Sequence, residues 1–198
     1  MTFYPTKINR RFNAPENAGR ADRANGVGTG ASFVCGAFVR YYLRIDAQTK
    51  EINEAKFKTD GCGYAAAAAD VLAGLVKGKN LTELHGLDES VLRADIEAEL
   101  EKFSADRAHC LKICLDALHA AFADFRAFQI EEFAGEKALI CTCFGISEDA
   151  IEKAIAKNAL ESVEEVTDAC QAGGGCGSCR FLIQEILDTS QNERFEGS

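Results

Sequence analysis

Four cysteines toward the C-terminal end constrain this fold more than any other feature of the sequence. They form two close pairs, Cys141-Thr-Cys143 and Cys176-Gly-Ser-Cys179, and 32 residues lie between the pairs. Four thiolates at this spacing are the ligands that a tetrahedral soft-metal site or an iron–sulfur cluster requires. Three glycines at 173–175 precede the second pair, and glycine lets the backbone come close to whatever the sulfurs hold. We therefore expect residues 141–179 to fold around a metal site.

The charge of the chain limits its partners. The 198 residues include 22 Lys and Arg against 31 Asp and Glu, a net charge of −9, which argues against nucleic acid as a partner. Residues 1–50 carry the opposite balance, with eight basic and three acidic side chains. This basic N-terminal part is either a docking surface or a solvated face.

The chain shows no pattern typical of export or membrane insertion. Its first residues lack the long apolar core of a signal peptide. The most apolar run, residues 62–76, contains Asp70 and is too short to span a bilayer. We expect a cytoplasmic protein with no membrane partner. Nine cysteines in that compartment favour metal or redox chemistry over structural disulfides.

The first half of the chain reads as a small antiparallel sheet packed by helices, an α+β fold. Residues 13–32 are rich in Gly and Asn and predict a loop, whereas 31–45 predict one long strand or a hairpin. Residues 52–59 alternate apolar and polar side chains, as a partner strand does.

Helices are predicted after Cys62, from Asp88 to Lys102, and from about Ala108 to Phe128. The alanine-rich first helix runs to about Val76 and ends at Gly78. An apolar stripe marks the third helix and comprises Leu111, Cys114, Leu115, Leu118, Phe122 and Phe125. Cys62, His109 and Cys110 then lie at helix N-termini, where free amides and the helix dipole stabilise a thiolate.

Residues 129–138 break the stripe and predict a domain boundary, with one domain at 1–130 and a small all-α domain at 138–190. Ser147 is placed to cap a helix. Ser162-Val-Glu-Glu165 has the capping-box pattern for a second helix, and residues 180–188 predict a third. Because this helical core is small, a bound metal would contribute much of its folding free energy.

The C-terminal cysteines lie in a recognisable context. Cys141-Thr-Cys-Phe-Gly-Ile-Ser, Ser162-Val-Glu-Glu-Val-Thr and Ala172-Gly-Gly-Gly-Cys-Gly-Ser-Cys resemble the bacterioferritin-associated ferredoxin type of domain, which also forms the middle of NifU proteins. The resemblance implies a permanent, redox-active [2Fe–2S] cluster with Cys141, Cys143, Cys176 and Cys179 as ligands. Zinc accepts the same four thiolates and is the alternative occupant. Cys170 lies outside the pattern and reads as a small buried apolar residue.

Three further cysteines, Cys35, Cys62 and Cys110, have no spacing rule that links them. Their order, together with Asn9-Arg-Arg-Phe-Asn-Ala-Pro-Glu-Asn-Ala-Gly, Gly26-Val-Gly-Thr-Gly and Phe57-Lys-Thr-Asp-Gly-Cys-Gly, resembles the IscU-type scaffold domain over about residues 3–128. With the ferredoxin-like domain behind it, the whole chain resembles NifU. The resemblance implies that these cysteines hold a labile [2Fe–2S] cluster and that His109 is the fourth ligand.

The function that the resemblance implies is assembly, and the chain itself is then no enzyme. A cysteine desulfurase of the NifS or IscS type supplies sulfur, and the cluster assembled on a homodimeric scaffold passes to apo iron–sulfur proteins. Two alternatives are an electron-transfer protein that uses the cluster of residues 141–179, and a protein with structural zinc sites.

Three departures from the family pattern bear on this function. The family's Cys-Gly-Asp is here Cys35-Gly36-Ala37, and the loss of a carboxylate near the cluster predicts slower cluster release. Phe103-Ser-Ala-Asp-Arg107 replaces the motif that a specialised Hsp70-type chaperone reads. The 19 residues after Cys179 contain no further Cys-x-x-Cys, which leaves a two-domain variant or a shortened chain as alternatives.

Overall fold

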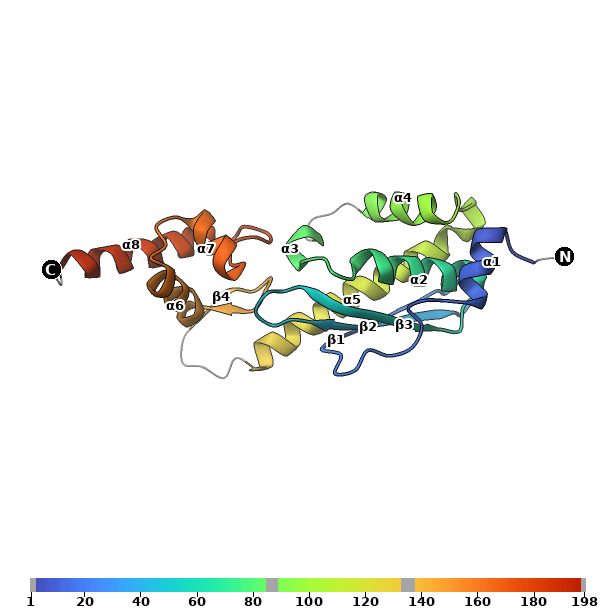
Figure 1. The fold of residues 1–198 in the computed structure, drawn as a ribbon, viewed down its shortest axis with the longest axis horizontal. Helices are drawn as coiled ribbons and strands as arrows, with labels where there is room; N and C mark the ends of the chain where they lie inside the picture. The colour runs from blue at the N-terminus through green and yellow to red at the C-terminus, as the bar shows by residue number, and fades with distance from the viewer. Residues whose placement is uncertain (1–2, 85–88, 133–137, 197–198) are drawn as a thin grey trace. The chain divides into compact units, whose positions relative to one another are not determined.

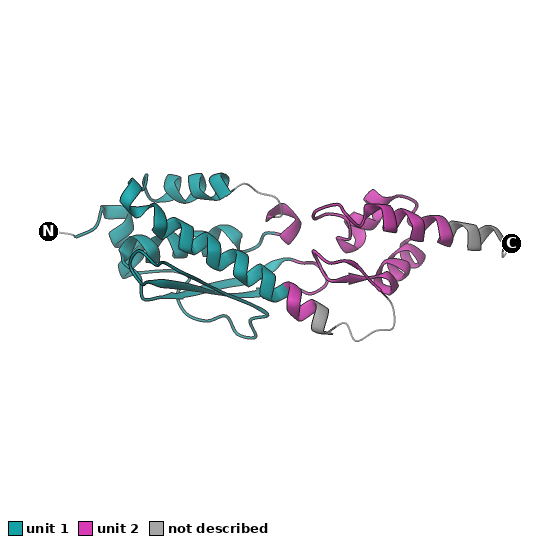
Figure 2. Cartoon of the chain, turned by 180° about the vertical axis from the view of Figure 1, so that it is seen from behind, with its two compact units in different colours: residues 1–46, 51–79, 87–125 teal, residues 47–50, 80–86, 126–198 magenta. Residues whose placement is uncertain are grey.

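The computed structural model describes residues 3–84, 89–132 and 138–196. The chain divides into two compact units (Figure 2). Unit 1 comprises residues 1–46, 51–79 and 87–125, and unit 2 comprises residues 47–50, 80–86 and 126–198. The elements labelled in Figure 1 are, in chain order, α1 Thr6–Asn13, β1 Gly26–Ala31, β2 Phe38–Ile45, β3 Ile52–Thr59, α2 Gly63–Val76, α3 Leu81–Leu84, α4 Glu89–Glu99, the 3-10 turn η1 Ala105–Arg107, α5 Ala108–Glu132, β4 Leu139–Cys141, β5 Ile146–Ser147, α6 Glu148–Asn158, α7 Val163–Cys170 and α8 Arg180–Glu196.

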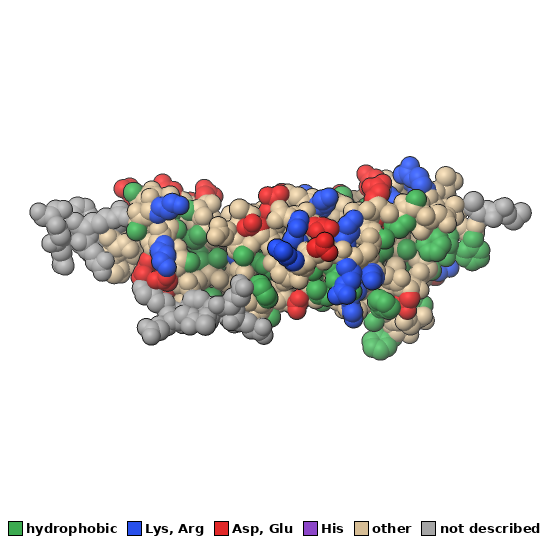
Figure 3. Space-filling model, turned by 60° about the horizontal axis from the view of Figure 1, so that its bottom comes forward, with side chains coloured by type: hydrophobic (Ala, Val, Ile, Leu, Met, Phe, Trp, Pro, Cys, Tyr) green, Lys and Arg blue, Asp and Glu red, His purple; other side chains and the backbone are tan. Residues whose placement is uncertain are grey.

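Unit 1 contains a three-stranded antiparallel sheet in the order β1-β2-β3. Strand β3 covers the residues predicted for the partner strand, and its register sets Tyr41 opposite Phe57. Along β2 the inward side chains Val39, Tyr41 and Leu43 are fully buried, whereas Arg40 is exposed. Figure 3 shows Lys and Arg side chains gathered on the solvent face of this sheet. The α+β class predicted for this part of the chain is confirmed.

Strand β1 corrects the prediction that residues 13–32 form a loop throughout, because residues 26–31 pair with β2. The glycines in this segment serve close packing. A Cβ added to Gly28 would lie 2.0 Å from the backbone nitrogen of Ala121, and one added to Gly30 would lie 2.3 Å from the Ile113 carbonyl oxygen. Helix α5 therefore lies directly on the backbone of β1, which only glycine permits. Of residues 31–45, predicted as one strand or a hairpin, residues 38–45 form β2 and residues 32–37 form the loop that carries Cys35, so the hairpin begins earlier, at Gly26.

Helices α2 and α5 begin where the sequence predicts, directly after Cys62 and at Ala108. The predicted stripe on α5 is buried except for Phe122, which is half-buried. Tyr41 of β2 lies under α2, where its hydroxyl donates to the Ala69 carbonyl oxygen at 3.1 Å. The sheet and these two helices thus form the core that fixes the starts of both helices.

Asp70 fastens the N-terminal segment to α2. Its carboxylate is fully buried and accepts hydrogen bonds from the Arg11 guanidinium at 2.9 Å and from the Asn17 backbone amide at 2.7 Å. A buried carboxylate is tolerated when it is paired and hydrogen-bonded in this way. The charge inside the most apolar run of the sequence is therefore a structural anchor for α1 and the loop that follows.

Unit 2 packs α6, α7 and α8 around a small apolar core that includes Ile151, Val166 and Ile183. Both predicted helix starts are confirmed: Ser147 accepts a hydrogen bond from the Ala150 amide at 3.2 Å, and Ser162 with Glu165 forms a capping box. Helix α8 runs to residue 196 rather than 188. The expected all-α region also contains the β4–β5 pair, which closes the loop around the first two cysteines.

Two short segments from earlier in the chain, residues 47–50 and 80–86, belong to unit 2. The Leu81 amide donates to the Lys50 carbonyl oxygen at 3.0 Å and joins them. The domain ranges 1–130 and 138–190 stay a prediction. Residues 133–137 of the predicted boundary, and Asp88 at the start of the second predicted helix, lie outside the described residues. No helix among the described residues is long and apolar enough to cross a membrane.

Candidate metal centres

The three dispersed cysteines are brought to one end of unit 1 by three different elements. Cys35 lies exposed in the loop between β1 and β2, Cys62 is the N-cap residue of α2, and Cys110 lies in the first turn of α5. Gly36 has φ +73°, which lets the Cys35 loop turn tightly, and the Gly36 amide donates to the Ser32 carbonyl oxygen at 2.8 Å. A strand loop and two helix N-termini therefore converge.

The thiols of Cys62 and Cys110 are close enough to share a metal. Their sulfur atoms lie 3.8 Å apart, and the Cys110 sulfur lies 3.5 Å from Nε2 of His109. Two thiolates on one tetrahedral metal, with bonds of about 2.3 Å, lie roughly 3.8 Å apart. A Cys35 thiolate also acts electrostatically on Cys110, which places it in the same cluster of groups. The residues present therefore fit a thiolate and imidazole donor set.

The pKa of Cys110 corrects the expectation that a helix start stabilises its thiolate. The pKa of Cys110 is raised to about 12, mostly by burial and also by the neighbouring Cys62 and Cys35, against a smaller lowering by Arg107. Desolvation and like charge outweigh the helix dipole at this position. Two thiolates side by side are tolerable only with a cation between them, so the same geometry that raises the pKa favours metal binding with release of protons.

Two other residues near this centre stand out in the sequence, Cys114 and Ala37. Cys114, predicted as core, is fully buried, and its thiol donates to the Cys110 carbonyl oxygen at 3.2 Å. Ala37 is 9% exposed, and the neighbouring Phe38 amide donates to the Asp60 carboxylate at 2.8 Å. Cys114 is thus structural. Asp60, directly after β3, is a carboxylate bound to the first residue of β2, next to Ala37.

The second centre lies in unit 2 and is built from the two cysteine loops. The sulfur atoms of Cys143 and Cys176 are 3.3 Å apart, and the thiols of Cys141 and Cys179 are hydrogen-bonded to each other. Burial and, to a smaller extent, the adjacent Cys141 together raise the pKa of Cys179 to about 11. Each loop therefore contributes one cysteine to each close pair, as a four-thiolate site requires.

Of the glycines at 173–175, Gly175 packs directly against a cysteine of this centre, whereas the close approach of all three to a bound metal stays a prediction. A Cβ added to Gly175 would lie 2.9 Å from Cβ and 3.0 Å from the sulfur of Cys143, so a larger residue would displace that thiol. Gly173 and Gly177 have φ of +83° and +77°, which L side chains rarely adopt. Four thiols in a glycine cradle fit a [2Fe–2S] cluster or a zinc ion.

Ser178 is a residue of this centre that the sequence patterns did not single out. The Cys176 thiol donates to the Ser178 hydroxyl oxygen at 3.3 Å. In the thiolate form the Ser178 hydroxyl and amide donate to the sulfur instead, and together with Cys143 they lower the pKa of Cys176 to about 7. The motif Cys176-Gly-Ser-Cys179 contains the signal, because a hydroxyl two residues after a cysteine can reach its sulfur. Cys170, predicted buried, is half-buried and donates to the Val166 carbonyl oxygen at 3.2 Å.

The candidate ligands lie in close pairs rather than in closed sets. Among residues 3–84, 89–132 and 138–196, no three His, Cys, Asp or Glu side chains are arranged to hold a metal ion. The assignment of eight ligands to two centres therefore stays a prediction, based on the pairs and on the residue types.

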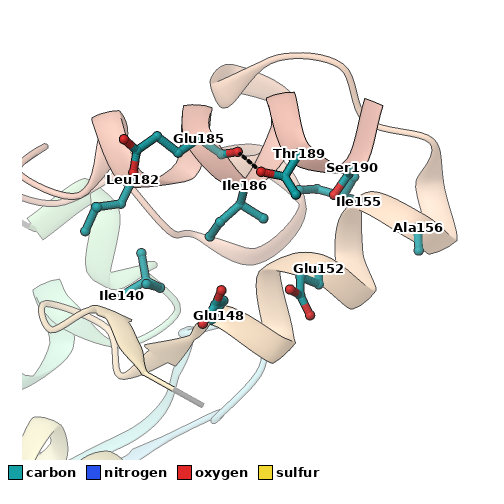
Figure 4. A pocket seen from close by; sticks show the side chains of 10 residues that line it. All are labelled: Ile140, Glu148, Glu152, Ile155, Ala156, Leu182, Glu185, Ile186, Thr189 and Ser190. Carbon is teal, nitrogen blue, oxygen red and sulfur yellow. Dashed lines mark hydrogen bonds between the residues drawn. The ribbon is translucent and has the colours of Figure 1, made fainter. Parts of the chain in front are cut away.

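A cavity of about 770 Å³ in unit 2 is lined by residues other than the cysteines (Figure 4). Helices α6 and α8 provide most of its lining. Glu148 and Glu152 come from α6, and Leu182 and Ile186 come from α8. Figure 4 shows Thr189 hydrogen-bonded to the Glu185 carbonyl oxygen along one wall, at 2.9 Å. No cysteine lines this cavity, so it takes no part in the centre described above.

Comparison with known proteins assigns each half of the chain. Residues 3–132 match the model of the NifU-like N terminal domain, and residues 139–189 match that of the BFD-like [2Fe-2S] binding domain. The chain is 33% identical over 187 residues to the nitrogen fixation protein NifU of Azotobacter chroococcum mcd 1, covering 94% of this chain and 59% of that protein. It is also 32% identical over 126 residues to the iron-sulfur cluster assembly scaffold protein IscU of Aquifex aeolicus, covering 63% of this chain and 78% of that protein.

A solved structure agrees on the fold. The crystal structure of a nitrogen-fixing NifU-like protein (N-terminal) from Brucella abortus superposes with a TM-score of 0.51 at 18% identity, covering 66% of this chain and 96% of that chain. This chain spans about three fifths of the length of the NifU of A. chroococcum. Because the first family model covers more than half of the chain, the chain belongs to the family of proteins with a NifU-like N-terminal domain.

Proposed function

We propose that this chain is a scaffold on which iron–sulfur clusters are assembled and from which they pass to apo-proteins. Cys35, Cys62, His109 and Cys110 hold the cluster under assembly, which is the cargo of the protein. The observation that carries this proposal is the convergence of Cys62 and Cys110 at 3.8 Å, with His109 3.5 Å from the Cys110 sulfur. Relatives named as NifU and as IscU scaffold proteins support it.

The proposed thiolate and imidazole ligands suit a cluster that is released to an acceptor protein. An imidazole in place of a fourth thiolate leaves the cluster less negatively charged and gives it a neutral ligand that a proton can displace. Cys35 is exposed, so an acceptor's thiol can approach one edge of the site. The site thus combines two anchored thiols with one accessible side.

The four thiols of unit 2 hold a second, permanent [2Fe–2S] cluster in this proposal. Cys141 and Cys179 are buried, and Cys143 and Cys176 complete the set. When bound, such a cluster supplies one-electron redox chemistry. The Ser178 hydroxyl and amide donate to the Cys176 sulfur and stabilise its thiolate form. Zinc remains the substitute metal to test for.

Sulfur delivery defines the partners. A thiolate of the scaffold attacks the outer sulfur of a persulfide on a cysteine desulfurase, the sulfur–sulfur bond breaks, and the desulfurase cysteine leaves as a thiolate. Two electrons from an external donor then reduce the transferred sulfur to sulfide. The enzyme in this exchange is the desulfurase, and apo iron–sulfur proteins receive the product. Homodimer formation and a cytoplasmic location stay predictions.

Cluster transfer tests the proposal. The purified protein is incubated with iron(II), cysteine, a reductant and a pyridoxal-phosphate cysteine desulfurase, then separated from them and mixed with an apo-ferredoxin. We expect newly loaded iron and sulfide to appear on the ferredoxin, followed by its visible circular dichroism. A protein that loads nothing beyond its permanent cluster, or that loads but does not transfer, would contradict the proposal.

Substitution of Ala37 by aspartate is expected to speed cluster release to the apo-acceptor on the order of tenfold, the range seen when groups around metal ligands change. A carboxylate there adds an oxygen ligand and a second negative charge near Asp60, whose carboxylate accepts from the Phe38 amide. The rate is followed by visible circular dichroism of the acceptor. Equal release rates in the parent and in Ala37→Asp would show that the missing carboxylate does not slow exchange.

A further inference from the structure

Lys50 is a buried cation in the unit that carries the four C-terminal cysteines. Its side chain is 1% exposed, and its ammonium donates to the Ala47 carbonyl oxygen and, at 2.7 Å, to Oε1 of Gln129. Lys50 also has φ +60°, a backbone conformation that a residue with a side chain rarely adopts. The surrounding contacts therefore hold this side chain in one place.

The partner of Lys50 packs against the first cysteine loop. Gln129 is 9% exposed, and a Cβ added to Gly145 would lie 2.5 Å from Cβ of Gln129. Gly145 is two residues after Cys143 and has φ +65°, so the loop leaves room for the glutamine that binds the ammonium. The chain from ammonium to amide to cysteine loop is continuous.

The backbone of Lys50 leads to the second cysteine loop as well. Its carbonyl oxygen accepts from the Leu81 amide at 3.0 Å. The next residue, Thr82, contacts the glycine run, since a Cβ added to Gly174 would lie 3.1 Å from Cγ2 of Thr82. Gly174 is two residues before Cys176. Residues next to Lys50 in space thus contact both loops that carry cluster ligands.

The charge of Lys50 reaches the cysteines of this unit. Burial raises the pKa of Cys170, a hydrogen bond from Ala172 lowers it, Cys141 raises it, and the Lys50 ammonium lowers it. The pKa of Cys170 therefore responds both to Cys141, a proposed cluster ligand, and to the Lys50 ammonium. In a buried environment, where solvent screens weakly, a fixed charge acts on groups that it does not touch.

We propose that the Lys50 ammonium, held by Gln129, raises the reduction potential of the cluster bound by Cys141, Cys143, Cys176 and Cys179. A [2Fe–2S] core with four thiolates carries a net charge of roughly −2 when oxidised and −3 when reduced. Reduction adds one electron from a one-electron donor, and no bond forms or breaks. The cation stabilises the more negative state more strongly, so its removal lowers the potential. This inference rests on the permanent cluster of the proposed function.

The test is a redox titration with dithionite, followed by visible absorption and by electron paramagnetic resonance. Lys50→Met removes the charge at similar length, and its midpoint potential is expected to shift to more negative values. Lys157→Met is the matched control, because Lys157 is exposed in the same unit and its charge is screened. Its midpoint is expected to stay at the parent value.

A second variant keeps the test decisive if Lys50→Met fails to fold. Gln129→Glu keeps the size and the contact with the ammonium and neutralises its charge, so the midpoint is again expected to fall. Gln184→Glu, at an exposed position, is its control. If Gln129→Glu binds a full cluster and its midpoint potential does not shift, the proposal for Lys50 is wrong, and the proposed permanent cluster is unaffected. A parent protein that binds no cluster at its C-terminal cysteines overturns the permanent cluster as well.

Discussion

Replacement of Cys35, Cys62 and Cys110 together by alanine is expected to reduce cluster transfer to an apo-ferredoxin at least about 100-fold, to the background of the assay. Even the loss of groups that only orient metal ligands costs roughly 10–100-fold in affinity or activity, and here three proposed ligands are removed. The sulfurs of Cys62 and Cys110 lie 3.8 Å apart. Neither α2 nor α5 offers a replacement thiol at the surface, because the other cysteine of α5, Cys114, is fully buried. Transfer is measured with desulfurase-loaded protein and the acceptor's circular dichroism.

The control for this variant is Cys170→Ala, which removes a cysteine that lies outside both proposed ligand sets. We expect it to transfer at the parent rate. The triple variant should keep the iron and the visible spectrum of the C-terminal cluster, because its four cysteines are unchanged. Transfer that survives the triple replacement would contradict the scaffold function and favour an electron-transfer role for the remaining cluster.

The second large effect is expected in unit 2. Replacement of Cys141, Cys143, Cys176 and Cys179 by alanine should unfold the region of α6, α7 and α8. A thiolate metal site contributes about 10–16 kcal/mol to the folding of small domains, comparable with or larger than the 5–15 kcal/mol net stability of ordinary proteins. The core of this region is small, with Ile151, Val166 and Ile183 among its few large buried residues, and it cannot offset such a loss.

Limited proteolysis with mass spectrometry measures this effect together with the far-ultraviolet circular dichroism at 222 nm. We expect cleavage within residues 139–196 of the fourfold variant at protease concentrations that leave the parent intact. The triple variant of unit 1 serves as the control, because it removes three thiols and leaves this cluster in place. Equal protection of parent and fourfold variant would mean that packing alone holds α6, α7 and α8 together.

Local signals in the sequence predict much of the fold. The capping residues Ser147 and Ser162, the alanine-rich run after Cys62 and the apolar stripe of α5 each fix a helix through neighbours within one turn. Such contacts are visible in a short window of sequence. The paired spacing of the C-terminal cysteines likewise predicts their meeting, and the structure brings the Cys143 and Cys176 sulfurs within 3.3 Å.

Features that depend on distant residues escaped prediction. The glycines of β1 read as a loop because their reason, the close approach of α5, lies about 90 residues later. The pKa of Cys110 is raised rather than lowered, because its burial beside Cys62 outweighs the helix start. Lys50 gave no signal at all, since Gln129 lies 79 residues away and the positive φ of Lys50 is a property of the folded chain.

The presence of two separate cluster centres is best tested by the number of iron, acid-labile sulfide and zinc ions per chain, counted before and after treatment with a chelator. After desulfurase-driven loading we expect about two iron and two sulfide ions per cluster, with one portion lost to the chelator and about two of each retained. The retained portion should disappear when Cys141, Cys143, Cys176 and Cys179 are replaced, and the labile portion when Cys35, Cys62 and Cys110 are replaced. Stoichiometric zinc without sulfide, or a single class of iron that the chelator removes completely, would contradict two separate centres.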